Sequence, residues 1–149
     1  MSAGALVIRP AEAGDLPGLL GLYRELNPSD PVIDRARAEE RFGVILTQPG
    51  MTVFIGLADE AMVSSVTLIV APNLTRNGAS YAVIENVVTA AAHRQRGYAR
   101  SLIQHAVEAA WRAGCYKVML LTGSKDPATL RFYENCGFSQ DKTGYQIRR

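Results

Sequence analysis

The most constraining feature of the sequence is the run at residues 84–100, where a strand leads through a basic turn directly into a strongly amphipathic helix. Apolar residues recur on one face of that helix, at Ala99, Leu102, Ile103, Ala106, Val107, Ala110 and Trp111. Gly114 follows as a helix-ending residue. A helix with such a stripe must bury it against another element, and the neighbouring strands indicate a sheet.

The remaining elements mix strands with helices. Strands are predicted at residues 5–8, 52–58, 61–71, 81–89 and 116–121, with a candidate final strand at 144–147. Helices are predicted at residues 15–26, 34–47 and 126–135, with Asp15, Asp34 and Asp126 as N-caps. The tight connection at Asp59 and Glu60 predicts a β-hairpin. This order favours an α/β (α+β) fold, in which a mixed sheet carries helices on both faces, and one domain spanning residues 1–149.

Composition excludes several classes of protein. Hydrophobic residues make up 48% of the 149 residues, which is enough for a core. The net charge of +2 does not favour a general nucleic-acid binder. No apolar run approaches the ~18 residues of a membrane span, and the first residues lack the pattern of a secretion signal. Cys115 and Cys136 show no metal-ligand spacing, so we expect no metal and two reduced thiols in the cytoplasm.

The basic turn before the amphipathic helix has the features of an anion site. The first N–H groups of a helix lack internal partners and carry the positive end of the helix dipole. Gly97 allows close approach of a ligand, and Arg94, Arg96 and Arg100 surround the turn with positive charge. The pattern is neither a Walker loop nor a dinucleotide fingerprint. Taken alone, it could equally be a solvated turn before an ordinary helix.

Three segments together resemble the GNAT superfamily of N-acetyltransferases. Arg94, Gly97 and Ala99 match the family's R/Q-x-x-G-x-G/A loop. The strand Ile-Glu-Asn-Val-Val-Thr at residues 84–89 is close to the family's Ile-Glu-Asp-Leu-x-Val pattern. Phe-Tyr-Glu-Asn-Cys-Gly-Phe at residues 132–138 matches the F-Y-x-x-x-G-F segment. The resemblance covers residues 53–138, and it implies a mostly antiparallel central sheet and acetyl-CoA as cosubstrate without a metal.

The resemblance also implies roles for individual residues. The pantetheine arm would lie along the strand, and the diphosphate would bind at the turn, so the expected cosubstrate-binding residues are Val87, Val88, Thr89, Arg94, Gln95, Arg96, Gly97, Tyr98, Ala99 and Arg100. A bulge after the acidic segment would leave main-chain groups free for this arm. Tyr133 would be the general acid and Glu85 the base, through water. Alternatively, Tyr133 is a core aromatic residue and Glu85 a surface residue.

The function that follows is direct acetyl transfer from acetyl-CoA to a small primary amine. Gly-Cys-Tyr-Lys at residues 114–117 and Gln-Ile-Arg at 146–148 add similarity to glucosamine-6-phosphate N-acetyltransferases. Members of the family often dimerise, so a homodimer is expected. One alternative is a domain of the same fold that binds an acyl-CoA as a sensor or regulator without turnover. Another is a nucleic-acid module that uses Arg94, Arg96 and Arg100.

Overall fold

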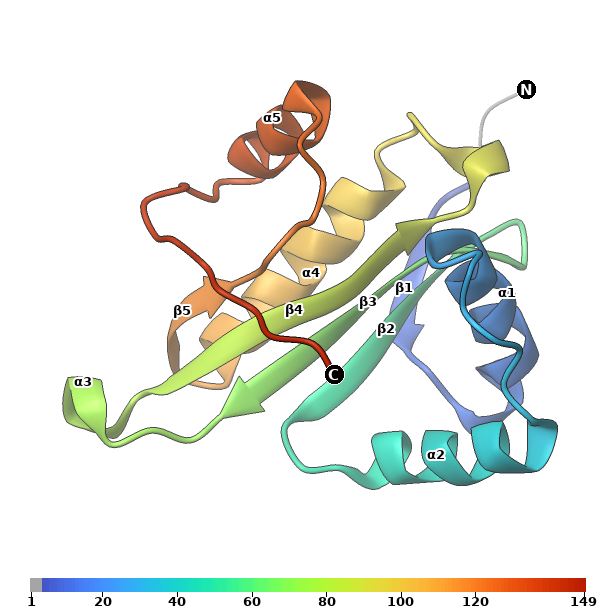
Figure 1. The fold of residues 1–149 in the computed structure, drawn as a ribbon, viewed down its shortest axis with the longest axis horizontal. Helices are drawn as coiled ribbons and strands as arrows, with labels where there is room; N and C mark the ends of the chain where they lie inside the picture. Colours follow the sequence, from blue (N-terminus) through green and yellow to red (C-terminus); the bar gives the residue numbers. More distant parts are fainter. Residues whose placement is uncertain (1–3) are drawn as a thin grey trace. The chain divides into compact units, whose positions relative to one another are not determined.

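The computed structural model describes residues 4–149, which divide into two compact units, one ending at Met119 and the other beginning at Leu120. The first unit holds a five-stranded sheet in the order β1-β2-β3-β4-β5 (Figure 1). All neighbouring strands are antiparallel except β4 and β5, which are parallel. The strands are β1 (Val7–Pro10), β2 (Met51–Ala58), β3 (Ala61–Ala71), β4 (Ser80–Thr89) and β5 (Cys115–Met119). The predicted mixed, mostly antiparallel sheet is confirmed.

Helices connect these strands. The first unit contains η1 (Ala13–Asp15), α1 (Leu16–Leu26), α2 (Arg35–Thr47), the one-turn α3 (Thr75–Gly78), η2 (Ala91–His93) and α4 (Tyr98–Arg112). The second unit contains α5 (Pro127–Asn135). Helix α4 is the amphipathic helix predicted after the basic turn. Leu102, Ile103, Ala106 and Ala110 of the predicted stripe are buried, but Trp111 is 51% exposed.

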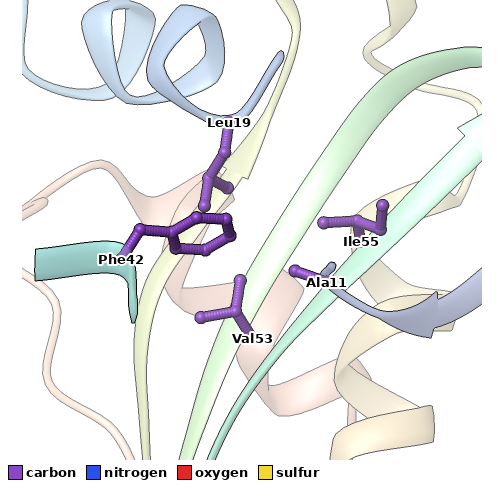
Figure 2. Packing of buried hydrophobic residues seen from close by; sticks show 5 residues of the cluster. All are labelled: Ala11, Leu19, Phe42, Val53 and Ile55. Carbon is purple, nitrogen blue, oxygen red and sulfur yellow. The ribbon is translucent and has the colours of Figure 1, made fainter. Parts of the chain in front are cut away.

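The helices of the first unit cover both faces of the sheet. Val53 and Ile55 of β2 pack with Leu19 of α1 and Phe42 of α2 (Figure 2). Between them in the strand, Phe54 places its ring edge-on against His105 of α4, with ring centroids 4.9 Å apart. Since successive strand residues point to opposite faces, α1 and α2 lie on one face and α4 on the other. The prediction of helices on both faces is therefore correct.

The predicted helix caps are correct at two of three positions. The Asp34 carboxylate accepts from the main-chain N–H of Arg37 at 3.2 Å, and Asp126 accepts from Ala128 at 2.9 Å. Asp15 does not cap α1 with its side chain. Its carboxylate binds the Arg9 guanidinium at 2.7 Å and accepts from the N–H of Glu12 at 2.7 Å. The prediction failed there because the Asp15 carboxylate is already bound to Arg9 of β1 and to the N–H of Glu12 at the start of η1, and is therefore not available to cap α1.

The candidate final strand at residues 144–147 is wrong. These residues adopt no regular structure, and Tyr145 and Ile147 are 91% and 98% exposed. Alternating apolar residues form a strand only where a sheet face buries them, and no such burial occurs here. That one domain spans residues 1–149 stays a prediction.

Candidate active site

A β-bulge interrupts β4 directly after its acidic residue. Ser65 of β3 pairs with Val88, and Thr67 pairs with Glu85, so β4 uses one residue more than β3 over the same stretch. Asn86 within the bulge has φ of +52°, in the left-handed region. A bulge bends its strand and re-aims the neighbouring peptide groups. The bulge that the resemblance implied is therefore present, in residues 86–87.

Beyond the bulge, one edge of β4 has no paired strand within its unit. The parallel pairing of β4 with β5 runs only from Ser80↔Cys115 to Val83↔Met119. Residues 84–89 therefore have β3 as their one strand neighbour in the unit that ends at Met119. An unpaired strand edge presents N–H and C=O groups to which an extended ligand can add as a further strand.

The main-chain groups of Thr89 face this open edge. The C=O of Val88 accepts from Ser64 Oγ at 2.8 Å, and the N–H of Ala90 donates to the C=O of Val63 at 2.8 Å, so both groups point toward β3. Because the peptide bonds are trans, the N–H and C=O of Thr89 point the opposite way. Arg94 Nε donates to that C=O at 3.3 Å. The N–H of Thr89 has no such partner among the described residues, so it can donate to a ligand at the open edge of β4.

The turn after β4 leads into α4 through two residues in the left-handed region. Gln95 has φ of +62°, and Gly97, the N-cap residue of α4, has φ of +81°. A Cβ placed on Gly97 would meet no atom within 4 Å, so the space in front of the helix end is open. The first hydrogen bond of α4 runs from Ser101 N to Gly97 O, at 3.1 Å. The N–H groups of the first helical turn, at Tyr98, Ala99 and Arg100, have no partner among the described residues.

The side chains at this turn differ in their exposure. Arg94, Gln95, Arg96 and Arg100 are exposed. Arg96 Nη1 lies 3.5 Å from His93 Nδ1. Tyr98 is the exception, because its side chain is buried with Ala58 and Val63 in the core, which leaves only its main chain for a ligand. The structure thus brings together unused N–H donors, a glycine and exposed guanidinium groups, which is a suitable arrangement for a diphosphate.

Glu85 lies on the face of the sheet that α1 and α2 cover. It pairs with Thr67, and Thr67 pairs with Val53, whose side chain packs under those helices. Directly paired residues share a face. The Glu85 side chain is exposed, so water can reach its carboxylate.

Tyr133 belongs to the second unit, on α5. Its ring stands edge-on to those of Phe132 and Phe138, with centroid distances of 5.1 and 6.3 Å. Burial raises the pKa of Tyr133 above its ordinary value of 10.0, and the neighbouring Cys136 raises it further. The phenol therefore keeps its proton at neutral pH.

A family model described as the acetyltransferase (GNAT) family matches residues 19–138. The chain belongs to this family. A solved structure named as a putative acetyltransferase from Agrobacterium tumefaciens str. C58 is 54% identical, with a TM-score of 0.93, and the match covers 96% of this chain and 99% of that one. Glucosamine 6-phosphate N-acetyltransferase 1 of Oryza sativa subsp. japonica is 33% identical, over 88% of this chain and 79% of its own length. Glucosamine 6-phosphate N-acetyltransferase of Trypanosoma brucei brucei is 31% identical, over 89% and 88% respectively.

These findings make the chain a GNAT N-acetyltransferase that depends on acetyl-CoA. The resemblance seen in the motifs is thus confirmed. No helix within residues 4–149 has the length and apolar character needed to cross a membrane. Over the same residues, no cluster of three or more His, Cys, Asp or Glu side chains could hold a metal ion.

Two polar residues of α1 contact the bulge of β4 and the connection to α4, although the sequence did not indicate them. Tyr23, predicted only as part of an apolar helix face, has its hydroxyl among the polar side chains of Thr67, Ser65 and Asn86 at the bulge. Burial raises the pKa of its hydroxyl above 10.0, and the interactions with these three polar side chains act in the opposite direction. Glu25 accepts from the N–H of Ala91 at 2.9 Å. Nothing in the local sequence marks either contact, because both depend on how α1 packs on the sheet.

Proposed function

We propose that this GNAT enzyme transfers the acetyl group of acetyl-CoA directly to the primary amine of a small, phosphorylated amino sugar, with glucosamine 6-phosphate as the first candidate. Two relatives that are 33% and 31% identical carry that substrate in their names. The structural observation that carries the transfer itself is the open edge of β4 beside the unpaired first turn of α4.

The cosubstrate would bind along main-chain groups that are already in place. The diphosphate would accept from the N–H groups of residues 98–100, with Arg94, Gln95, Arg96 and Arg100 around it. Gly97 and Ala99 leave room for it because neither carries a bulky side chain. The pantetheine arm would follow Val87, Val88 and Thr89 as an added strand. The Thr89 N–H, which faces the open edge, would donate to the thioester oxygen and stabilise the negative charge that develops there.

The transfer needs one proton removed and one supplied. The neutral amine nitrogen attacks the thioester carbon, the carbon–sulfur bond breaks, and the products are an N-acetyl amide and the free thiol of CoA. We assign Glu85 as the base that takes the amine proton through a water, since its carboxylate is exposed on the α1–α2 face of β4. Tyr133 would be the acid that protonates the thiolate, because its phenol is protonated at neutral pH.

An acceptor screen tests this function. Purified protein is mixed with acetyl-CoA and a panel of glucosamine 6-phosphate, unphosphorylated glucosamine, amino acids and polyamines, and thiol release and product mass are followed. We expect release with glucosamine 6-phosphate and a product heavier by one acetyl group. If thiol is released only with another amine of the panel, that amine replaces glucosamine 6-phosphate as the proposed acceptor. Tight binding of acetyl-CoA without thiol release from any amine would instead favour a sensor that binds acyl-CoA without turnover.

The quaternary structure and the cellular location stay predictions. We propose a homodimer in the cytoplasm. Within residues 4–149 neither Cys115, which is buried, nor Cys136, which is partly buried, forms a disulfide, as expected for a reducing compartment. Light scattering of the purified protein and fractionation of the source cells test the two statements.

A further inference from the structure

A hydrogen bond between a helix on one face of the sheet and the connection to α4 has no role in the function described above. Glu25 Oε1 of α1 accepts from the main-chain N–H of Ala91 at 2.9 Å, although the two residues are 66 positions apart. Ala91 is the first residue of η2, and its neighbour Ala90 supplies no side-chain cap. The Glu25 carboxylate therefore caps η2 from a distant element.

The hydrogen bond between Glu25 and Ala91 lies at the point where the chain leaves the sheet on its way to α4. The N–H of Ala90 makes the last hydrogen bond to β3, and the N–H of Ala91 comes immediately after it. From there to Gly97 the chain passes through η2 and through Gln95 in the left-handed region. Among the described residues, no other side chain from outside residues 90–96 hydrogen-bonds to the main chain of that segment. Glu25 thus fixes the point where the connection leaves the sheet.

Helix α1 is itself anchored beside that point. Two residues before Glu25, the largely buried Tyr23 has its hydroxyl among the polar side chains of Ser65, Thr67 and Asn86 at the bulge of β4. Leu19 and Leu22 of the same helix are buried at 2% and 3% exposure. The last turns of α1 are therefore packed on the sheet, and the Glu25 carboxylate comes from this packed helix.

We propose that Glu25 is a positioning residue for acetyl-CoA: by capping η2 it orients residues 90–97, and with them the first-turn N–H donors of α4 that receive the diphosphate. This inference rests on the proposed binding of CoA at that turn. Glu25 does not contact the ligand in this assignment. Its negative charge, taken alone, would repel a diphosphate, so the hydrogen bond and the charge have opposite effects on affinity.

Substitutions at Glu25 can separate the effect of the hydrogen bond from the effect of the charge. Glu25→Gln removes the charge but keeps a side-chain oxygen that can accept from Ala91. Glu25→Ala removes both. Glu108→Ala removes an exposed acid from α4 and serves as the control. Binding of CoA to each protein is measured by calorimetry, and exchange of the Ala91 amide hydrogen is measured by NMR.

If Glu25 positions the turn, Glu25→Ala weakens CoA binding about fivefold to tenfold, the size of one net hydrogen bond, and speeds exchange at Ala91. Glu25→Gln then binds CoA at least as tightly as wild type, as does Glu108→Ala. Equal or tighter binding by Glu25→Ala, together with faster exchange at Ala91, would show that only the charge matters and would overturn the inference while leaving the proposed function intact. Absence of CoA binding by the wild-type protein would overturn both.

Discussion

Ser64 Oγ donates its hydrogen to the main-chain oxygen of Val88, at 2.8 Å, from a side chain with no exposed surface. Ser64 Oγ also lies 2.9 Å from Thr89 Oγ1. A serine hydroxyl has one hydrogen, and Val88 receives it, so the Thr89 hydroxyl must be the donor in the second contact. This short relay holds the peptide between Val88 and Thr89 with its N–H toward the open edge of β4.

Ser64→Ala should therefore affect both folding and cosubstrate binding. The substitution leaves the Val88 oxygen and the Thr89 hydroxyl without their partner, at a cost of about 1–3 kcal/mol in the free energy of unfolding. Because the peptide is then free to tilt, we expect weaker CoA binding as well. Urea denaturation and calorimetry measure the two effects.

A buried neighbour provides the control. Ser65 Oγ donates to the main-chain oxygen of Phe54 at 2.9 Å, so Ser65→Ala removes a similar hydrogen bond that does not reach Val88. It should destabilise the fold to a similar extent and weaken CoA binding clearly less than Ser64→Ala does, because Ser65 reaches the proposed CoA site only indirectly, through Tyr23 of α1. If both variants weaken CoA binding equally, the Ser64 effect is one of general stability and the relay has no special role.

Two glycines at opposite ends of α4 allow a matched comparison. Gly97 and Gly114 have φ of +81° and +82°, and a Cβ added at either meets no atom within 4 Å. Alanine at either position should therefore cost about 1 kcal/mol of stability from backbone strain alone. Only Gly97→Ala should also weaken CoA binding, because its methyl group stands at the N-terminal end of the helix, where the diphosphate would bind. Thermal melts with and without CoA separate the two effects. A similar loss of the CoA-induced shift in Tm for both variants would contradict this site.

Most of the fold could be predicted because its signals are local. The stripe of α4 is read from spacing within one helix, and the hairpin of β2 and β3 from two apolar runs around Asp59 and Glu60. The strand at residues 144–147 failed for the opposite reason. Its alternating pattern satisfies the local rule, but Tyr145 and Ile147 remain exposed, and only tertiary burial makes such a pattern a strand.

The site could be predicted only where the chain itself lines it. Residues 84–100 are continuous in sequence, so the local pattern predicts a strand and a helix start there, while the bulge follows only from the resemblance to the GNAT family. Tyr23 and Glu25 reach the same region from a different helix. Their contacts depend on the packing angle of α1, which no spacing rule supplies. Tyr98 shows a related limit, because its position in the turn suggested a ligand contact while its side chain is needed in the core.

Tyr133→Phe tests the proposed role of Tyr133 as general acid. The variant keeps the ring contacts with Phe132 and Phe138 and loses only the hydroxyl, so the fold should be unaffected. We expect kcat to fall by about 10²–10⁴, with little change in the KM of the acceptor. Because the pKa of Tyr133 is raised, its proton remains through neutral pH, and the wild-type rate should decline from loss of this acid only above about pH 10. Tyr145→Phe, at an exposed position, is the control. A rate for Tyr133→Phe within about twofold of wild type would remove Tyr133 from the mechanism.

The ion pair between Arg9 and Asp15 should make stability depend on pH in a predictable direction. The ion pair is bidentate: Arg9 Nη1 donates to Asp15 Oδ2 at 2.7 Å, and Arg9 Nη2 donates to Asp15 Oδ1 at 3.1 Å. Hydrogen bonding to Arg9 holds the pKa of Asp15 below its ordinary value of 3.8. The folded protein therefore favours the ionised carboxylate. Its contribution is fully present above about pH 4 and is lost as pH falls through the lower pKa of the folded state.

Asp15→Asn should accordingly lower the urea midpoint at neutral pH, and the difference from wild type should shrink toward zero as the solution is acidified through the lowered pKa of Asp15 in the folded state. The amide removes the charge that binds Arg9 and also weakens the acceptor for the N–H of Glu12, which lies 2.7 Å from Asp15. Asp30→Asn, at an exposed loop position, should shift the midpoint little at either pH. If the Asp15→Asn difference persists unchanged in acid, the carboxylate acts through packing and not through its charge.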